Sequence, residues 1–384
     1  MYKMTDRAER TERTEDTART ERTERTERTE RTERTERTER TEDTARTEGT
    51  GGLVNVGFTC YANAAIQAFR HTKGLEELMN ENNYTKFLNV SKYTDTTKQF
   101  ANIVQNISRI TNKSSIRPNG FWNAFKQVAK DSCFEHLIER APHDAGEFLM
   151  FLLDCIHESL SREVVMNITL CNLKSEKQIF HQKSLEAWKT SFEKHFSPLV
   201  NMYFGMFHVQ IICKSCNNIS NRWEPFNTLK GVINKNDNTP TLIQCIHGEL
   251  NEELIEDYSC DKCSPKRTTA VRKTKVWKLP ETLIVILKRF SMDGNKIHTA
   301  IEPFDETLNF ETLFYKNSPN IIHSKYMLRS IIDHHGSANG GHYTAQAKHR
   351  KVNKWFLYDD DSVNEIQTPI LGNSSYIFFF ELSR

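Results

Sequence analysis

The sequence lacks any long apolar run: its two longest, LIVIL and YIFFF, are far too short to span a bilayer. It also opens with charged residues rather than an apolar stretch, so we expect no secretory signal. Neither sign of charge dominates, because 52 Lys+Arg stand against 50 Asp+Glu. Near-neutral charge argues against nucleic acid as the main partner. These absences predict a soluble protein with neither a membrane nor a nucleic acid as its partner.

Apolar side chains are almost missing from residues 1–50, which hold 13 of the basic and 15 of the acidic residues. Residues 9–48 are a tandem Glu-Arg-Thr repeat, interrupted twice by EDTAR. Glu and Arg four residues apart favour a helix, but frequent threonine weakens that preference and there is no apolar face to dock. We therefore expect residues 1–51 to be a disordered, low-complexity tail and linker. Residues 52–384 are enough for one large core or two smaller ones.

Cysteine is the informative residue type, since the chain holds nine, an odd number, and four of them form two C-x-x-C pairs. This pattern predicts a reducing compartment, the cytoplasm or the nucleus, in which cysteines do chemistry or bind metal. The pairs are CKSC (213–216) and CDKC (260–263), and four thiolates satisfy tetrahedral zinc. We expect a closed structural site that joins two hairpins, formed by Cys213, Cys216, Cys260 and Cys263. The alternative is four reduced cysteines without metal.

Helical patterns come first along the chain and strand patterns follow. AIQAFR (65–70) and HDAGEFLMFLLDCIHESL (143–160) repeat apolar residues at helical spacing. From about residue 203 the apolar stretches are rich in β-branched and aromatic residues: FHVQIIC, TTAVRKTKVWKL, TLIVILKRF, MLRSIID and SYIFFFEL. This order predicts an α+β fold without alternating βαβ units.

One cysteine, Cys60, stands where a glycine-bearing loop becomes a helix, in VNVGFTCYANAAIQAFRH (54–71). Thr59 is a candidate N-cap, which puts Cys60 in the first turn. The free N–H groups there favour a thiolate and lower its pKa. With a nearby amide, for which Asn55 is a candidate, they could also hold an oxyanion. The alternative is a buried structural cysteine at a helix end.

A thiolate nucleophile needs a base, and one region offers it: GGHYTAQA followed by WFLYDDD. His342 begins a strand pattern after two glycines. A hairpin would bring Asp359, Asp360 or Asp361 beside it. His334 and His335 are expected to lie on a surface loop.

Together these segments resemble the ubiquitin-specific proteases, a family of papain-like cysteine proteases that remove ubiquitin. The resemblance covers about residues 52–384. GLVNVGFTCYANAAIQ resembles the family's cysteine box, and GGHYTAQ with WFLYDDDSV resembles its histidine box. HDAGEFL, EPFNTL, YSCDKC and LPETLIVILKRF follow in the expected order. The resemblance implies a helical thumb (about 52–200), zinc-clipped β fingers (about 203–290) and a β palm (about 276–384).

The resemblance also assigns roles to single residues. Cys60 would be the nucleophile, His342 the base, Asp359 the third member of a triad and Asn55 the oxyanion-hole residue, while Asp360 could share the role of Asp359. The expected substrate-binding residues are Asp144, Glu147, Gly341 and Tyr343. In relatives the acids at the first two positions line the channel for the ubiquitin tail, which carries arginine. The two C-x-x-C pairs match the zinc site at the tip of the fingers.

The activity implied is hydrolysis of the (iso)peptide bond after the last glycine of ubiquitin, through a thioester and without a catalytic cofactor. Ubiquitin and ubiquitinated proteins would be the partners of a monomeric enzyme. Two alternatives remain: a hydrolase for another modifier with a Gly-Gly tail, and an inactive ubiquitin-binding scaffold. Three positions depart from the family pattern without touching the expected triad: Phe58 replaces Asn, Pro142 replaces Gln, and Ile286 replaces a frequent His.

Overall fold

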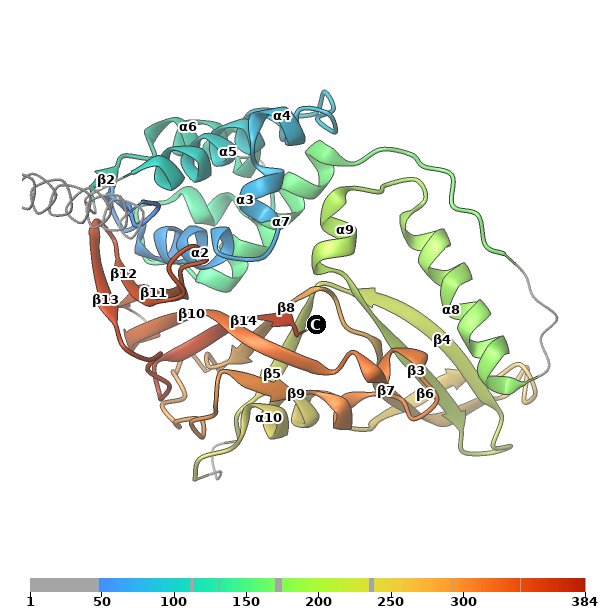
Figure 1. The fold of residues 1–384 in the computed structure, drawn as a ribbon. Helices are drawn as coiled ribbons and strands as arrows, with labels where there is room; N and C mark the ends of the chain where they lie inside the picture. The colour runs from blue at the N-terminus through green and yellow to red at the C-terminus, as the bar shows by residue number, and fades with distance from the viewer. Residues whose placement is uncertain are drawn as a thin grey trace, which may run out of the picture. The chain divides into compact units, whose positions relative to one another are not determined.

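Helices occupy the first part of the folded chain and strands the second, as the apolar patterns predict (Figure 1). The computed structural model describes residues 48–110, 114–130, 132–169, 175–234, 238–291, 293–338 and 340–383. The predicted Glu-Arg-Thr tail, up to residue 47, lies outside them. Residues Gly49–Arg384 form one compact unit. No helix in the described ranges is both long and apolar enough to cross a membrane.

The helical part surrounds one central helix, α2 (Cys60–Arg70), in which every residue is buried. It packs against α7 on one side and against strand β11 on another. The part consists of α2, α3 (Leu75–Leu78), α4 (Glu81–Tyr84), α5 (Thr94–Arg109), α6 (Asn119–Ala129), the 3-10 turn η1 (Glu135–Ile138), α7 (Ala145–Leu160), α8 (Glu176–Phe192) and α9 (Pro198–Tyr203). A short parallel pair, β1 (Gly52–Leu53) and β2 (Ser115–Ile116), lies beside them.

The larger sheet has the order β13-β12-β11-β10-β14-β8-β5, and β9 also pairs with β10. Its strands are β5 (Thr228–Val232), β8 (Thr282–Lys288), β9 (Thr307–Asn309), β10 (Lys325–Ser337), β11 (Gly340–Lys348), β12 (Trp355–Asp359), β13 (Ser362–Ile366) and β14 (Ser375–Leu382). Strand β14 is the last along the chain but pairs with β10 on one side and β8 on the other. Two further 3-10 turns, η2 (Glu311–Leu313) and η3 (Pro319–Ile322), precede β10.

Alternating residues of β14 divide the core between the two faces of this sheet. Ile377 and Phe379 join the core of the thumb helices. Phe378 and Phe380 join a second core on the opposite face. Period-two alternation with both faces covered explains why YIFFF is apolar at every position.

The smaller sheet has the order β4-β3-β7-β6. Its strands are β3 (Gly205–Cys213), β4 (Ile219–Phe226), β6 (Glu253–Ser259) and β7 (Arg267–Lys278). The pairs β3–β4 and β6–β7 are antiparallel hairpins. Each turn carries one of the C-x-x-C motifs.

One pair of strands in the larger sheet is parallel. Strands β5 and β8 run parallel, and α10 (Leu242–Glu249), which follows β5, packs on it. Because β6 and β7 of the smaller sheet come between α10 and β8, this pair is not an alternating βαβ unit, and the predicted α+β fold is confirmed. The sequence does indicate the start of α10, because Thr241 and Gln244 form a capping box there.

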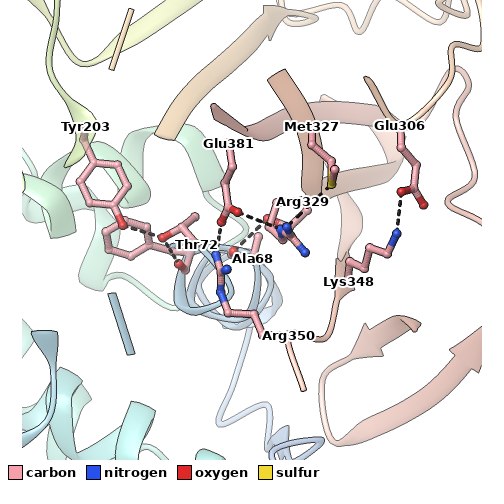
Figure 2. A network of polar contacts seen from close by, with 11 residues as sticks. Ala68, Thr72, Tyr203, Glu306, Met327, Arg329, Lys348, Arg350 and Glu381 are labelled. Atoms are coloured by element: carbon pink, nitrogen blue, oxygen red, sulfur yellow. Dashed lines mark hydrogen bonds and ion pairs between the residues drawn. The ribbon is translucent and has the colours of Figure 1, made fainter. Parts of the chain in front are cut away.

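Polar contacts lie on both sides of the boundary between the helical part and the larger sheet, and one crosses it, from Ser330 Oγ of β10 to the backbone oxygen of Ala68 in α2 over 2.9 Å (Figure 2). The Tyr203 hydroxyl of α9 lies 2.5 Å from the hydroxyl of Thr72, which follows α2. In the sheet, Arg329 Nε donates to Glu381 Oε2 over 3.1 Å, and Arg350 contacts the other oxygen of the same carboxylate. One buried acid thus joins β14, β10 and the turn after β11.

Candidate active site

Cys60 is the first residue of α2, as predicted, and its side chain is 8% exposed. The backbone N–H of Tyr343 on β11 lowers the pKa of its thiol, as do those of Tyr61 and Cys60 itself. The thiol thus lies where the thumb helix meets the strand that carries His342.

The loop before Cys60 is organised by the side chain of Asn55. Its Oδ1 accepts hydrogen bonds from Gly57 N at 3.0 Å and from Thr59 N at 3.1 Å. Gly57 and Phe58 have positive φ values, +117° and +56°. Thr59 occupies the N-cap position, but its side chain does not cap the helix. It bonds back to the loop instead, accepting from Val56 N, so the predicted cap is wrong.

His342 and Asp359 lie next to each other, as the predicted hairpin requires. Strands β11 and β12 pair antiparallel, and His342 Nε2 lies 2.5 Å from Asp359 Oδ1. Because the carboxylate only accepts, Nε2 carries the proton of a neutral imidazole. Nδ1 is then left as the basic nitrogen.

Asp360 binds the cysteine loop to this hairpin, which the sequence pattern did not reveal. Its carboxylate accepts from Asn55 Nδ2 at 2.9 Å and from Asn63 Nδ2 at 2.8 Å. Its backbone oxygen accepts from Leu53 N at 2.8 Å. The acceptor atoms of Asp360, Asp359 and His342 lie within 4.8 Å of one another. Asp360 therefore contacts the expected oxyanion residue, whereas Asp359 contacts the expected base.

The pKa of the Cys60 thiol is raised in this structure, chiefly because burial disfavours the thiolate. The carboxylate of Asp360 raises it further, while the N–H groups of Tyr343 and Tyr61 lower it. The place of Cys60 at the helix N-terminus predicts a lowered thiol pKa. The effect of burial is larger, so the pKa is raised instead. In this state the thiol needs a base to remove its proton.

The two acids expected to bind substrate lie at the start of α7. Asp144 is its N-cap and accepts from Glu147 N at 2.8 Å and from the Tyr376 hydroxyl at 2.6 Å. Burial raises the pKa of Asp144. Glu147 contacts His136 of η1, with Oε2 3.0 Å from Nε2. Sequence reasoning missed Tyr376 and His136, for which no local motif exists.

A groove of about 390 Å³ runs between α7 and the sheet next to these acids. Asp144 and Glu147 line its helical side. The side of the sheet has apolar and aromatic residues and three cations: Ile286, Phe290, Tyr376, Lys230, Lys288 and Arg289. Ile286 thus puts an apolar side chain where relatives often have His.

Gly341 and Tyr343 flank His342 on β11. A Cβ at Gly341 would collide with His334 and with the backbone of His335, so no other residue fits there. The ring of Tyr343 is buried, 4.5 Å from that of His334. His334 itself is 4% exposed, and burial lowers its pKa to about 4, so its expected place on a surface loop is wrong.

The four C-x-x-C sulfurs meet at the tips of the two hairpins. Cys213 and Cys263 sulfurs lie 3.9 Å apart, and those of Cys216 and Cys260 lie 3.6 Å apart. All four lie within 4.8 Å of one another and none is in a disulfide. Four convergent thiols at this spacing fit a tetrahedral metal site.

Comparison with known proteins agrees with this geometry. The sequence model of the ubiquitin carboxyl-terminal hydrolase family matches residues 51–380. Human ubiquitin carboxyl-terminal hydrolase 2 is 25% identical over 346 residues, which are 87% of this chain and 55% of the relative. Ubiquitin carboxyl-terminal hydrolase 36 of Drosophila ananassae is 30% identical over 338 residues, 86% of this chain and 28% of the relative. The chain thus spans about half or less of the length of these relatives.

Solved structures show the same fold. The DUB module of SAGA with Ubp8, Sgf11, Sus1 and Sgf73, bound to monoubiquitin, matches with a TM-score of 0.66 and 22% identity. The match covers 88% of this chain and 70% of that one. A second such module, bound to ubiquitin aldehyde, matches with a TM-score of 0.64. The thumb, palm and fingers expected from the sequence are therefore the helical part, the larger sheet and the smaller sheet. With its cysteine and histidine segments joined in one site on this fold, the chain belongs to the ubiquitin carboxyl-terminal hydrolase family.

Proposed function

We propose that the protein is a cysteine-dependent deubiquitinase that cleaves the (iso)peptide bond after the last glycine of ubiquitin. One observation carries this proposal: the hairpin β11–β12 holds His342 bonded to Asp359, and α2, which begins at Cys60, packs against β11. A nucleophile, a base and a group that orients the base are thus neighbours.

The first half of the reaction begins with His342. Its Nδ1 takes the proton of Cys60 as the sulfur attacks the carbonyl carbon of the last glycine. The raised pKa of the thiol favours this coupled transfer over a thiolate formed beforehand. The imidazolium, stabilised by Asp359, then protonates the departing lysine amine while the C–N bond breaks. A thioester remains, and water activated by the same histidine hydrolyses it.

The oxyanion would be held by the N–H at the start of α2 and by the amide of Asn55. One hydrogen of that amide is bonded to Asp360, which fixes the orientation of the side chain. Its second hydrogen is available to the oxyanion, because an amide nitrogen carries two. Loss of one such donor typically costs about 2.7–4 kcal/mol in the transition state.

We propose that the ubiquitin tail lies in the groove between α7 and the larger sheet. Asp144 and Glu147 would bind its arginine side chains and fix its register. Glu147 would exchange its contact with His136 for one with the tail. The absence of space for a side chain at Gly341 suits a narrow passage close to the nucleophile.

We further propose that the four clustered cysteines hold a structural zinc ion. Its role would be to join the β3–β4 and β6–β7 turns, with all four positions filled by sulfur and none open for catalysis. None of the eight cysteines in the described ranges is in a disulfide, which supports work in a reducing compartment, the cytoplasm or the nucleus.

Covalent capture tests the function directly. Ubiquitin with an electrophile at its C-terminus should add to the wild-type protein and to Cys133→Ala, a matched change of an exposed cysteine. Cys60→Ala should not react. A mass increase of one ubiquitin in that pattern identifies both modifier and nucleophile. Capture by the same warhead on another Gly-Gly modifier alone, or no capture at all, would replace the proposal with one of the two alternatives.

A further inference from the structure

We propose that a pocket beside the cysteine loop is a second substrate subsite, which binds an acidic side chain of the polypeptide from which ubiquitin is removed. This inference rests on the proposed function. The pocket, of about 430 Å³, lies between the loop that precedes Cys60, helix α6 and the segment from η1 to Arg140. It is called the α6 pocket below. Its lining includes Phe58, Trp122, Asn123, Lys126, Glu139 and Arg140.

The α6 pocket is rich in hydrogen-bond donors without partners. Lys126 and Arg140 are exposed, and neither forms an ion pair in the described part of the chain. The guanidinium of Arg140 lies against the loop, with Nη2 3.4 Å from the place of a Cβ on Gly57. Against these two cations the lining offers one acid, Glu139. A carboxylate can accept from several such donors at once.

Trp122 supplies an independent observation. Its side chain is 6% exposed, and its Nε1–H is buried without a hydrogen-bond partner among the described residues. Buried donors of this kind are rare because they lose their bond to water, and this one belongs to a residue that lines the pocket. The indole can only donate, which again selects an acceptor.

The rim of the pocket has the strain typical of functional loops. Phe58 holds φ = +56°, a conformation that side chains other than Gly and Asn seldom adopt, and its ring is 54% exposed. The hydrogen bonds of Asn55 keep the neighbouring backbone in place. An exposed ring two residues before the nucleophile can contact the aliphatic stem of the substrate lysine.

Position distinguishes this pocket from the groove for the tail, because the two share no lining residue. The groove has the acids Asp144 and Glu147 beside the cations Lys230, Lys288 and Arg289. Of these cations, Lys288 is paired with Glu249, and Arg289 donates to backbone oxygens. In the α6 pocket neither Lys126 nor Arg140 has such a partner among the described residues, so a cationic tail is repelled there. The other polypeptide at the scissile bond, the one that carries the lysine, remains as the partner for the donor-rich pocket.

The test uses two fluorescent peptides, each joined through its lysine to ubiquitin. They differ only at the residues that flank the lysine, which are Asp and Glu in one peptide and Asn and Gln in the other. The wild-type protein should cleave the acidic conjugate with kcat/KM about two- to fivefold higher, the range for exposed ion pairs. The double variant Lys126→Gln/Arg140→Gln should bring this ratio to about one. The matched control Arg117→Gln/Lys130→Gln changes exposed cations outside the pocket and should keep the wild-type ratio.

An equal rate on both conjugates, or a ratio that survives the double variant, would overturn the subsite. Cleavage of neither conjugate would count against the proposed function. In that case a peptide-binding measurement tests the subsite. Cys60→Ala protein should bind the labelled acidic peptide more tightly than its amide counterpart, measured by fluorescence anisotropy. Trp122→Phe keeps an aromatic ring but removes the donor, and should reduce that preference. Equal binding of the two peptides would refute the subsite whether or not the enzyme is active.

Discussion

At the scale of single residues, Asp360 connects the two halves of the site. It receives hydrogen bonds from Asn55 and Asn63, which are 305 and 297 residues away along the chain. Its positive φ of +51° is one that Asp and Asn tolerate better than most residues. Asp359, by contrast, contacts only the histidine side of the site in the hydrogen bonds described above.

We predict that Asp360→Asn lowers kcat/KM on a ubiquitin amide of a small fluorophore by about tenfold or more. The new amide has only one accepting oxygen, so its nitrogen must face the amide nitrogen of either Asn55 or Asn63. The cysteine loop should shift to avoid this contact, and small misplacements of reacting groups lower the rate strongly. Asp361→Asn is the matched control, because it keeps both bonds and changes the charge of the same turn. Equal activity of Asp360→Asn and wild type would remove Asp360 from this positioning role.

A second prediction concerns the protonation of Cys60. Burial and Asp360 raise the pKa of its thiol above the ordinary value of 9.0, so the thiolate forms only as the pH rises past that value. In the free protein, the rate of alkylation by iodoacetamide should therefore increase with pH and reach half its maximum above pH 9. Cys60→Ala gives the background from other cysteines. A plateau already reached at neutral pH would instead indicate a preformed thiolate–imidazolium pair.

At the scale of elements, the β3–β4 and β6–β7 turns, which carry the four clustered cysteines, lead to a third prediction. The purified protein should carry one zinc per chain, measured by plasma mass spectrometry. Cys213→Ser should lose the metal and lower the thermal midpoint by more than about 4 °C, since the ion would join the turns of two hairpins that are otherwise held together by the pairing of β3 with β7. Cys133→Ser, at an exposed position outside the cluster, should change neither value. A zinc-free wild-type protein, or an unchanged midpoint, would contradict the site.

Local sequence signals predicted the elements that carry the site. Apolar periodicity located α2 and α7, and the glycine pair with WFLYDDD predicted the hairpin that joins His342 to Asp359. The doubled C-x-x-C spacing likewise predicted that four sulfurs meet at two turns. In each case a few neighbouring residues determine the geometry, so a single sequence suffices.

Other features depend on side-chain contacts that no sequence pattern shows, and they could not be predicted. Thr59 has the right side chain for a cap, but Asn55 and Val56 compete for its hydroxyl. The polar pattern around His334 indicates a loop, yet Tyr343 and Phe290 cover the ring in the fold. The helix α10 was missed for a different reason, since its capping box was present in the sequence and went unused.

At the scale of the whole molecule, Glu381 connects several elements. Its side chain is 7% exposed and pairs with Arg329, 14% exposed, and with Arg350, 33% exposed. A carboxylate shared by two cations offsets the loss of hydration that burial causes, and removing one member of such a group is strongly destabilising.

We therefore predict that Glu381→Gln lowers the free energy of unfolding by about 3 kcal/mol, at the lower end for buried pairs because Arg350 is partly solvated. Urea denaturation followed by circular dichroism measures the change. Glu365→Gln breaks the pair with Lys354, in which both side chains are about half exposed, and should cost less than about 1 kcal/mol. Similar effects of the two substitutions would show that Glu381 acts as an ordinary surface charge.

The position of β14 has a consequence for folding during synthesis on the ribosome. Strand β8 is synthesised early and β10 later, but the strand that must lie between them is made after both. Until residue 382 has left the exit tunnel, β8 and β10 each expose an unpaired edge, and Cys60, the proposed nucleophile made hundreds of residues earlier, has no complete site around it. We therefore expect the site to form only after this strand is inserted, so a premature stop codon before β14 should abolish the fold rather than trim it.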